Sequence, residues 1–178
     1  AGVTLNVYFL RDDRIGTAHR RVPPTRAVAR TALEQLLAGP TAGERAAGLR
    51  SEIPDGTRLL DVRVADGVAT VDLSGEFQAG GGPRSLPARL AQVVFTLTQF
   101  PTVEGVAVLL DGRPLTSVAG MSLPDPMRRS DFAAMTPLIL VESPAPGDVV
   151  SSPLRVAGLN NTFEATVRIR IEGSDGRT

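Results

Sequence analysis

The sequence predicts an α+β protein: a four-stranded sheet of the split βαβ type with two helices on one face, followed by part of a β-sandwich. Two amphipathic helical segments alternate with short apolar strands over residues 1–135. An Asp-Gly dipeptide joins the two middle strands, and proline and glycine turns divide short strands after residue 136. We therefore expect two domains, over residues 1–135 and residues 136–178.

The first strand is predicted over residues 3–10, where apolar residues alternate, and charged residues 11–14 form a turn. The first helix begins near Thr25 and ends at Gly39 and Pro40, because glycine adopts the left-handed cap and proline prevents continuation. The apolar stripe of this helix consists of Val28, Ala29, Ala32, Leu33 and Leu36. These elements form the first strand and helix of the predicted α+β domain.

A short helical turn is predicted over residues 42–47, because Thr41 and Glu44 have the spacing of a capping box. Two strands then meet at Asp66-Gly67, a dipeptide that favours a two-residue hairpin. The side chains expected to face the core from these strands are Leu60, Val62, Val64, Ala69, Val71 and Leu73.

The second long helix is predicted to begin at Ser85, as its N-cap, and to end before Pro101. Its narrow apolar stripe consists of Leu86, Leu90, Val93, Val94 and Leu97, and the fourth strand follows with Val106, Val108 and Leu110 facing inward. The order strand-helix-strand-strand-helix-strand places both helices on one face of the sheet. The other face is left to solvent or to a partner.

The pattern weakens after the fourth strand. Residues 115–135 are predicted to be irregular and to pack back onto the sheet. Short strands are predicted over residues 138–141, 153–158 and 163–171, the last with clean alternation. Because a sandwich needs about seven strands, either the second domain is truncated in this chain or a neighbouring molecule supplies the missing pairing.

Several short segments carry a family resemblance: residues 37–41 (LAGPT), 53–57 (IPDGT), 71–74 (VDLS) and 92–100. They resemble the GerM-type (GerMN) sporulation and spore germination domain of bacterial cell envelopes. Residues 141–148 with 163–165 similarly resemble the immunoglobulin-like domain that often follows it. The resemblance implies a non-enzymatic, extracytoplasmic protein, often lipid-anchored, that helps to build sporulation or germination complexes. It supplies no catalytic residues.

Composition excludes several classes of function. Cysteine is absent, which excludes disulfides, thiolate metal sites and a cysteine nucleophile. The 19 basic and 19 acidic residues balance, so nothing electrostatic favours nucleic acid or an anionic membrane. With 4% aromatics and no Trp, an aromatic sugar platform is not expected. Every basic residue other than the histidine is Arg, as is typical of a GC-rich genome.

The sequence contains no membrane span, because no apolar run approaches roughly 18 residues. We expect a targeting segment or lipid anchor to have been omitted before Ala1. Membrane association is therefore expected only through an anchor that this chain lacks.

No residue set forms an active site, and we expect no catalytic, cofactor-binding or metal-binding residues. Asp61 lies opposite Asp72 on the outer face of the predicted hairpin, and Arg63, diagonal to Asp72, is expected to reach it, so a solvated pair is favoured over a cation site. Asp72 and Glu76 have the residue types of a glycosidase pair but stand at a polar strand end. His19 is the only histidine, and we expect it at the surface, repelled by neighbouring arginines.

The uncovered sheet face is the strongest candidate for binding. Tyr8, Leu10, Ala107 and Leu109 point away from the predicted core and carry no charge, which is unusual for a solvated face. Either residues 115–135 or the second domain cover these side chains, or a partner does. We take the four residues as a candidate partner surface.

Three functions are compatible with these observations. The preferred one is an envelope scaffold or interaction module that contacts envelope proteins, or assembles with itself, through a sheet face or edge. The second is a module that binds a wall polymer such as peptidoglycan through loops at the domain junction. The third is a hydrolase that uses Asp72 and Glu76.

Overall fold

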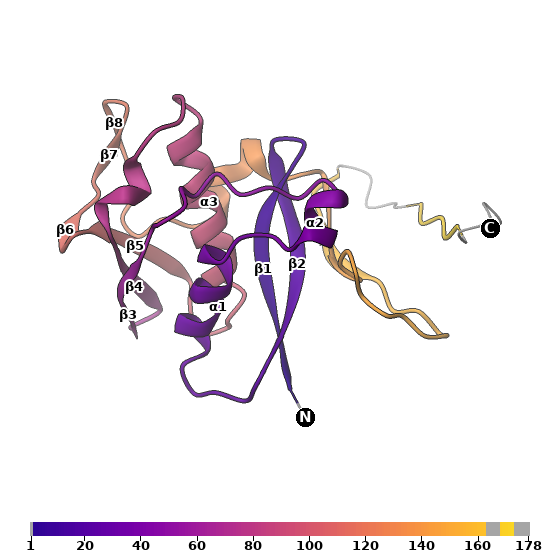
Figure 1. The fold of residues 1–178 in the computed structure, drawn as a ribbon. Coiled ribbons are helices and arrows are strands. Elements are labelled where there is room, and N and C mark those ends of the chain that lie inside the picture. The colour runs from indigo at the N-terminus through magenta and orange to yellow at the C-terminus, as the bar shows by residue number, and fades with distance from the viewer. Residues whose placement is uncertain (1, 163–167, 173–178) are drawn as a thin grey trace.

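The computed structural model describes residues 2–162 and 168–172 (Figure 1). Its strands are β1 (Val3–Arg11), β2 (Arg14–Val22), β3 (Leu59–Ala65), β4 (Val68–Leu73), β5 (Gly105–Leu110), β6 (Arg113–Pro114), β7 (Ser117–Val118), β8 (Met121–Ser122), β9 (Ile139–Ser143) and β10 (Ala157–Asn160). The helices are α1 (Val28–Leu37), α2 (Ala42–Ala46) and α3 (Ser85–Leu97), with 3-10 helices η1 (Gly75–Gln78) and η2 (Arg129–Met135). Over these described residues, no helix has the length and apolar character needed to cross a bilayer.

The chain begins with a long antiparallel ribbon of β1 and β2. The strands turn at Asp12 and Asp13, whose φ angles of 48° and 62° are the left-handed pair that a two-residue hairpin requires. The predicted turn is thus confirmed, but the second strand of the ribbon was not predicted. Its sequence, RIGTAHRRV, mixes apolar and basic residues without a clean alternation. The burial of its side chains is correspondingly irregular along the strand.

The α+β class is confirmed, with helices packed on a mixed four-stranded sheet of order β3-β4-β5-β6. β3 pairs antiparallel with β4 through the predicted hairpin, in which Asp66 and Gly67 have φ angles of 50° and 79°. β4 pairs parallel with β5, and β6 adds a short antiparallel edge. The strand membership differs from the prediction: β1 pairs with β2 outside this sheet, and β6 takes the fourth place.

α1 and α3 lie between the ribbon and the sheet, as Figure 1 shows. The architecture therefore has three layers rather than the two expected. α3 is buried on all sides from Ala88 to Leu97, since it contacts both β1 and β5. The predicted apolar stripe covers only one side of this helix.

A polar stripe on α3 and just beyond it closes the free edge of β1. Gln99 accepts a hydrogen bond from the Asn6 amide at 2.9 Å and donates to the Asn6 carbonyl at 2.6 Å. The Thr96 hydroxyl accepts from the Tyr8 amide at 3.1 Å, and Gln92 donates to the Tyr8 carbonyl at 3.4 Å. Because spacings of four and three residues share one helix face, these side chains satisfy an edge that would otherwise be open.

The helix ends follow the prediction at one site and depart from it at another. Thr41 and Glu44 form the predicted capping box of α2, and Gly39 has the left-handed φ of 75°. Ser85 is not the N-cap of α3 but its first residue; its hydroxyl accepts from the Gly82 amide at 3.1 Å. The helix begins after a turn of the glycine-rich loop.

The second part of the chain contributes the two-stranded sheet of β9 and β10, and β9 packs against β2. Leu140 of β9 belongs to the same continuous core as the ribbon, α3 and the sheet. Of the strand predicted over residues 163–171, residues 163–167 lie outside the described residues. Residues 168–172 are not in a strand, and Ile169 and Ile171 are exposed.

The structure corrects half of the candidate partner surface. Tyr8 and Leu10 are 0% and 1% exposed, because β1 lies in the ribbon and not at the uncovered face of the sheet. The alternative, coverage by residues 115–135 and the second domain, holds for Tyr8, which contacts Arg129 and Glu142. Ala107 and Leu109 are half-buried on the outer face of the four-stranded sheet, where they remain a candidate surface.

Candidate functional site

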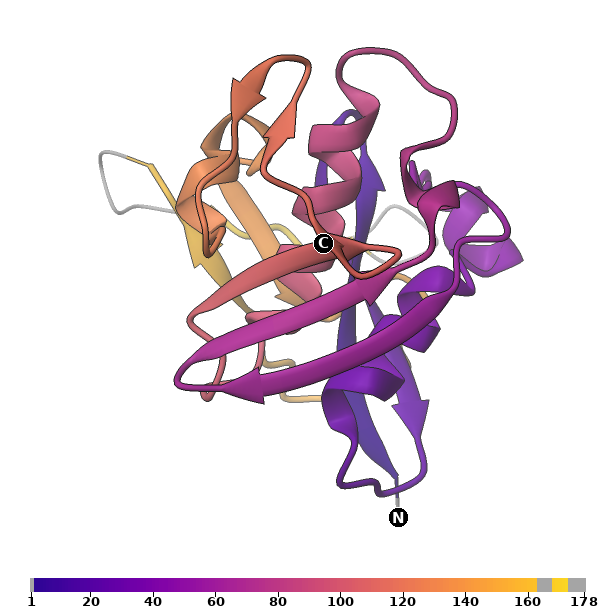
Figure 2. The same cartoon turned by 90° about the vertical axis from the view of Figure 1, so that its left-hand side faces the viewer.

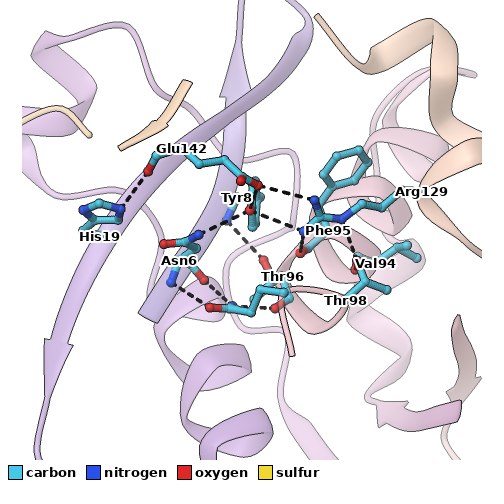
Figure 3. Close-up of polar contacts among 10 residues, drawn as sticks. Asn6, Tyr8, His19, Val94, Phe95, Thr96, Thr98, Arg129 and Glu142 are labelled. Carbon is cyan, nitrogen blue, oxygen red and sulfur yellow. Dashed lines mark hydrogen bonds and ion pairs between the residues drawn. The ribbon is translucent and has the colours of Figure 1, made fainter. Parts of the chain in front are cut away.

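The main polar cluster among the described residues joins β1, β2 and η2 to β9 and the loop after it. It consists of Tyr8 on β1, His19 on β2, Arg129 on η2, Glu142 on β9 and Asp148 after β9, and we call these residues the junction network. Figure 3 shows four of them converging from elements that are far apart in the sequence. Tyr8 and Glu142 are 134 positions apart, and Tyr8 and Arg129 are 121 positions apart.

The Tyr8 hydroxyl is the centre of the junction network. It donates to the Glu142 carboxylate and accepts from Arg129 at 3.3 Å and from the Asn6 side chain at 3.4 Å. Burial, together with the hydrogen bond to Glu142, raises the pKa of Tyr8 to about 12. A phenol with that pKa stays protonated at neutral pH, so it acts here as a fixed donor and not as a base.

The Arg129 guanidinium is held on three sides. It donates to the Thr98 hydroxyl at 2.8 Å, to the Phe95 carbonyl at 3.1 Å and to Glu142 at 3.4 Å. Its central carbon also lies 4.7 Å from the centroid of the Phe95 ring and 5.1 Å from that of Tyr8. Arginine delocalises its charge over a plane, which lets one side chain stack on rings and form several hydrogen bonds.

His19 connects β2 to the second domain and is not the solvent-facing, repelled histidine that the sequence predicts. Its Nδ1 lies 2.7 Å from the Asp148 carboxylate and its Nε2 lies 2.8 Å from the Glu142 main-chain oxygen. The Asp148 carboxylate and the Glu142 main-chain oxygen can only accept hydrogen bonds. His19 therefore donates to both when each of its ring nitrogens carries a proton. Asp148 also accepts from the Ala145 amide at 2.8 Å, which fixes the loop after β9.

The junction network joins the ribbon and η2 to β9 and the loop after it. Each of its side chains forms at least one hydrogen bond to another residue of the network or to nearby main chain. An acid-base catalyst needs a group that titrates near neutral pH beside space for substrate, whereas the Tyr8 hydroxyl is 0% exposed and strongly held in its protonated form. The arrangement fixes the orientation of β9 against the ribbon.

Sequence reasoning missed most of the junction network. Arg129 is one of many scattered arginines, and Glu142 lies in a short strand with an ordinary turn after it. Tyr8 gave the only usable signal, since it is the single tyrosine and stands in an apolar strand. A buried tyrosine hydroxyl needs a polar partner, but the partner comes from beyond residue 120 and its identity is not encoded locally.

The predicted pair Asp61 and Asp72 is in register on the outer face of the sheet. Arg63 bonds to Asp61 at 2.8 Å and not to Asp72, and Arg30 also lies 3.6 Å from Asp61. Asp72 accepts from the Gly112 amide at 3.0 Å. Among the described residues no group of three potential ligands could hold a metal ion, and the donor set here falls short of the about six oxygens that a hard cation prefers.

The Asp72 and Glu76 pair does not have the properties of a hydrolytic pair. Glu76 is fully exposed on η1, and a hydrogen bond from Ser74 lowers its pKa, which keeps it ionised at neutral pH. A general acid needs the opposite shift. The cleft beside η1 and β6 is lined by Gly75, Gln78, Leu110, Asp111, Arg113, Pro114 and Leu115, and by neither carboxylate.

Two family models match the chain over separate ranges. The model described as Germane, sporulation and spore germination, matches residues 6–116, more than half of the chain. The chain belongs to this family. The Germane match contains the ribbon, the three α-helices and the four-stranded sheet. A second model, the immunoglobulin-like domain of bacterial spore germination, matches residues 138–178.

Solved structures share the fold of this Germane domain. The first GerMN domain of the sporulation protein GerM from Bacillus subtilis is 26% identical with a TM-score of 0.62, and the match covers 72% of this chain and 99% of that one. The tandem GerMN domains of the same protein are 22% identical with a TM-score of 0.61. That match covers 74% of this chain and 48% of the tandem chain, so the protein spans about half of its length.

A predicted lipoprotein from Clostridium perfringens has the same fold, with 23% identity and a TM-score of 0.53. The match covers 74% of this chain and 90% of the clostridial chain. A comparison with curated protein sequences found no match. The Germane assignment therefore rests on the family model and on the shared fold.

Proposed function

We propose that this protein is a non-enzymatic interaction module of the bacterial cell envelope, in which the Germane domain holds the immunoglobulin-like segment in a set orientation. The observation that carries the proposal is the junction network. It commits the Tyr8 phenol, the Arg129 guanidinium and the Glu142 carboxylate to joining the two parts of the chain. Family membership supports a connection with sporulation or germination.

The proposal places the protein outside the cytoplasm, attached by a lipid anchor in the full-length protein. The fold shared with a predicted clostridial lipoprotein supports this location. Membrane attachment then places the exposed surfaces of both domains within reach of other envelope proteins.

The partner surface that we propose is the outer face of the four-stranded sheet. Leu109 and Asp72 lie side by side in adjacent strands, as do Ala107 and Thr70. Leu109 and Ala107 are only half-buried, so apolar atoms are accessible in the middle of a polar face. A few apolar residues inside a polar rim are the usual composition of a binding site for another protein.

A crosslinking pull-down from the organism's envelope, with the full-length protein as bait, tests the function. We expect a defined protein partner that is lost with Leu109→Arg and retained with Met121→Arg, because Met121 is 68% exposed on the separate β7–β8 hairpin. Both baits are checked for wild-type circular dichroism. A partner recovered equally by both variants contradicts the proposed surface, and hydrolysis of a wall substrate by the purified protein contradicts the non-enzymatic role.

A second function, binding of an anionic wall polymer such as peptidoglycan, is favoured by a cleft of about 660 Å³ at the domain junction. Arg21 and Arg155 line this cleft together with Thr4, Ser143 and Ser151, and with Asp148, which His19 contacts. The cleft therefore offers two guanidinium groups and hydroxyl donors beside one carboxylate. Co-sedimentation with purified wall tests it. Binding that is lost in Arg21→Ala with Arg155→Ala, but kept in Arg113→Ala, favours the polymer; no sedimentation rejects it.

A further inference from the structure

β3 is an edge strand whose outer side is open. Figure 2 shows it at the margin of the four-stranded sheet, with β4 on its inner side. In a two-residue hairpin the residues that flank the turn form a hydrogen-bonded pair, so Ala65 and Arg63 bond to β4. The intervening Val62 and Val64 therefore direct their amide and carbonyl groups away from the sheet.

The hydrogen bonds of β4 lead independently to the same assignment. The carbonyls of Gly67 and Leu73 accept from Gly105 and Asp111 on the β5 side, so the odd-numbered residues of β4 face β5. The even-numbered residues face β3, as the Ser74 bond to Arg58 shows. Among the described residues, no hydrogen bond reaches the outward groups of Val62 and Val64.

The side chains beside this open edge are apolar and accessible. Leu60 is 41% exposed and Val64 is 43% exposed, although the sequence predicts both in the core. A groove of about 280 Å³ runs between β3 and the start of α1, and Arg26 and Arg30 line it together with apolar residues: Val28, Ala29, Val62, Val64, Phe100 and Val103. Natural edge strands are usually protected by charge, bulges or cover. Here a bulge lies at one end, between Leu59 and Asp61.

Arg30 is the only charged side chain seen to approach the edge from α1, over the described residues. It lies 3.6 Å from Asp61 with both side chains partly exposed. An exposed ion pair at that distance contributes at most about 1 kcal/mol. It therefore leaves the edge available to a second strand, which would rest on the apolar groove beside α1.

The charges on the outer face select a second copy of this chain as the occupant. If two β3 strands pair antiparallel about a twofold axis at Val62, the outward groups of both Val62 residues meet in a hydrogen-bonded pair. Arg63 then lies opposite Asp61 of the other copy, and the reverse contact follows from symmetry. Val64 then lies across from Leu60 of the other copy, which is at the bulge between Leu59 and Asp61.

Alternative registers are less favourable. A twofold axis at Arg63 would place the two Arg63 side chains directly opposite each other. An axis at Val64 would place Arg63 opposite Ala65, which carries no charge. Asp72 and Asp61 lie next to each other across β4 and β3. Only an axis at Val62 places a cation, Arg63 of the other copy, on the free side of Asp61. Opposite charges in directly opposed positions stabilise a strand pair and like charges destabilise it.

We propose that the protein self-associates into a symmetric dimer through antiparallel pairing of β3 about Val62, with reciprocal Arg63–Asp61 contacts. The dimer joins two four-stranded sheets into one continuous sheet of eight strands, four from each copy. Because the outer face carrying Leu109 continues across this joint, the dimer presents that face twice.

Charge reversal provides a sharp test by light scattering or analytical ultracentrifugation of the full chain. The wild type is expected to approach twice the monomer mass as concentration rises. Asp61→Arg and Arg63→Asp each place like charges in opposition, and each alone is expected to dimerise roughly tenfold or more weakly. An equimolar mixture of the two variants restores both opposite-charge contacts, so it is expected to form a heterodimer.

Every outcome decides the proposal. A wild type that stays monomeric at all concentrations overturns it, as does a dimer insensitive to both reversals or a mixture that does not recover. Arg113→Asp, a reversal at the opposite margin of the same sheet, serves as the control and is expected to dimerise like the wild type. The test of self-association uses purified protein alone, whereas the pull-down needs a different protein as partner. Failure of the dimer proposal can therefore be distinguished from failure of the proposed envelope function.

Discussion

The Tyr8 side chain is the most informative single residue because it is both the centre of the junction network and a natural probe. The protein has one tyrosine and no tryptophan. Any tyrosine absorbance or fluorescence signal therefore reports on the contact between β1, η2 and β9. The environment of this one phenol has a direct consequence for pH dependence.

We predict that Tyr8 titrates at about pH 12 in the folded protein, against 10.0 for an unperturbed phenol. A pKa raised by folding means that the stabilising contribution is complete below pH 10.0 and is lost as pH rises through the folded pKa. Tyrosinate absorbance against pH measures the titration, and unfolding by urea at increasing alkaline pH measures the stability. A midpoint at the ordinary value in folded protein contradicts the buried hydrogen bond to Glu142.

At the scale of elements, side chains of α3 form the hydrogen bonds to the edge of β1 that a neighbouring strand would otherwise form. The helix supplies Gln92, Thr96 and, just beyond its end, Gln99 to the edge of β1, while its apolar residues fill the space between ribbon and sheet. Gln92 is fully buried and also joins two other segments: its side chain accepts from the Glu52 amide at 2.9 Å and donates to the Ser51 hydroxyl at 3.2 Å. Deleting it leaves several buried groups without partners.

Gln92→Leu is expected to lower the free energy of unfolding by about 2–4 kcal/mol, because a buried donor or acceptor left unpaired costs about 1–3 kcal/mol. Urea denaturation followed by circular dichroism measures the change. Gln78→Leu makes the same replacement at an exposed site on η1 and is expected to stay within about 0.5 kcal/mol of the wild type. Equal effects of the two substitutions would show that the edge of β1 gains nothing from α3.

At the scale of the whole molecule, the main hydrophobic cluster and the junction network together hold β9 against the rest of the described residues. Leu140 of β9 lies in the same hydrophobic cluster as the residues of β1, α3 and β5. The contacts of Glu142 with Tyr8 and Arg129, and of His19 with Asp148, surround this apolar contact. Loss of the junction network is therefore expected to release β9 without unfolding the Germane domain.

Glu142→Arg tests this by hydrogen exchange. It removes the acceptor of the buried Tyr8 hydroxyl and places a second cation beside Arg129; a buried donor left unpaired costs about 1–3 kcal/mol. We expect faster amide exchange in β9 while β3, β4 and β5 keep their protection. Asp55→Arg, a reversal in an exposed turn, is the control. Unchanged exchange in β9, or loss of protection everywhere, contradicts a junction network that acts locally.

The short-range features of this fold could be predicted from sequence. The hairpin at Asp66-Gly67, the capping box of Thr41 with Glu44 and the stop at Gly39-Pro40 each depend on residues within a few positions of one another. Local backbone preferences decide them, and they survive in any tertiary context that does not oppose them. Three of the segments that carry the family resemblance, residues 37–41, 53–57 and 71–74, are likewise local caps, turns and strand ends, whereas residues 92–100 include the buried half of α3.

By itself, the sequence determined the α+β class, most of the element positions and the family. Only the tertiary structure decided that β1 pairs with β2 instead of entering the sheet, that α3 is covered on both sides, and that Tyr8 is buried by Arg129 and Glu142. The packing of α3 against β1 and the burial of Tyr8 depend on contacts between residues more than 80 positions apart. Alternation shows that a strand has two faces, but which neighbour covers each face is settled by how the layers pack.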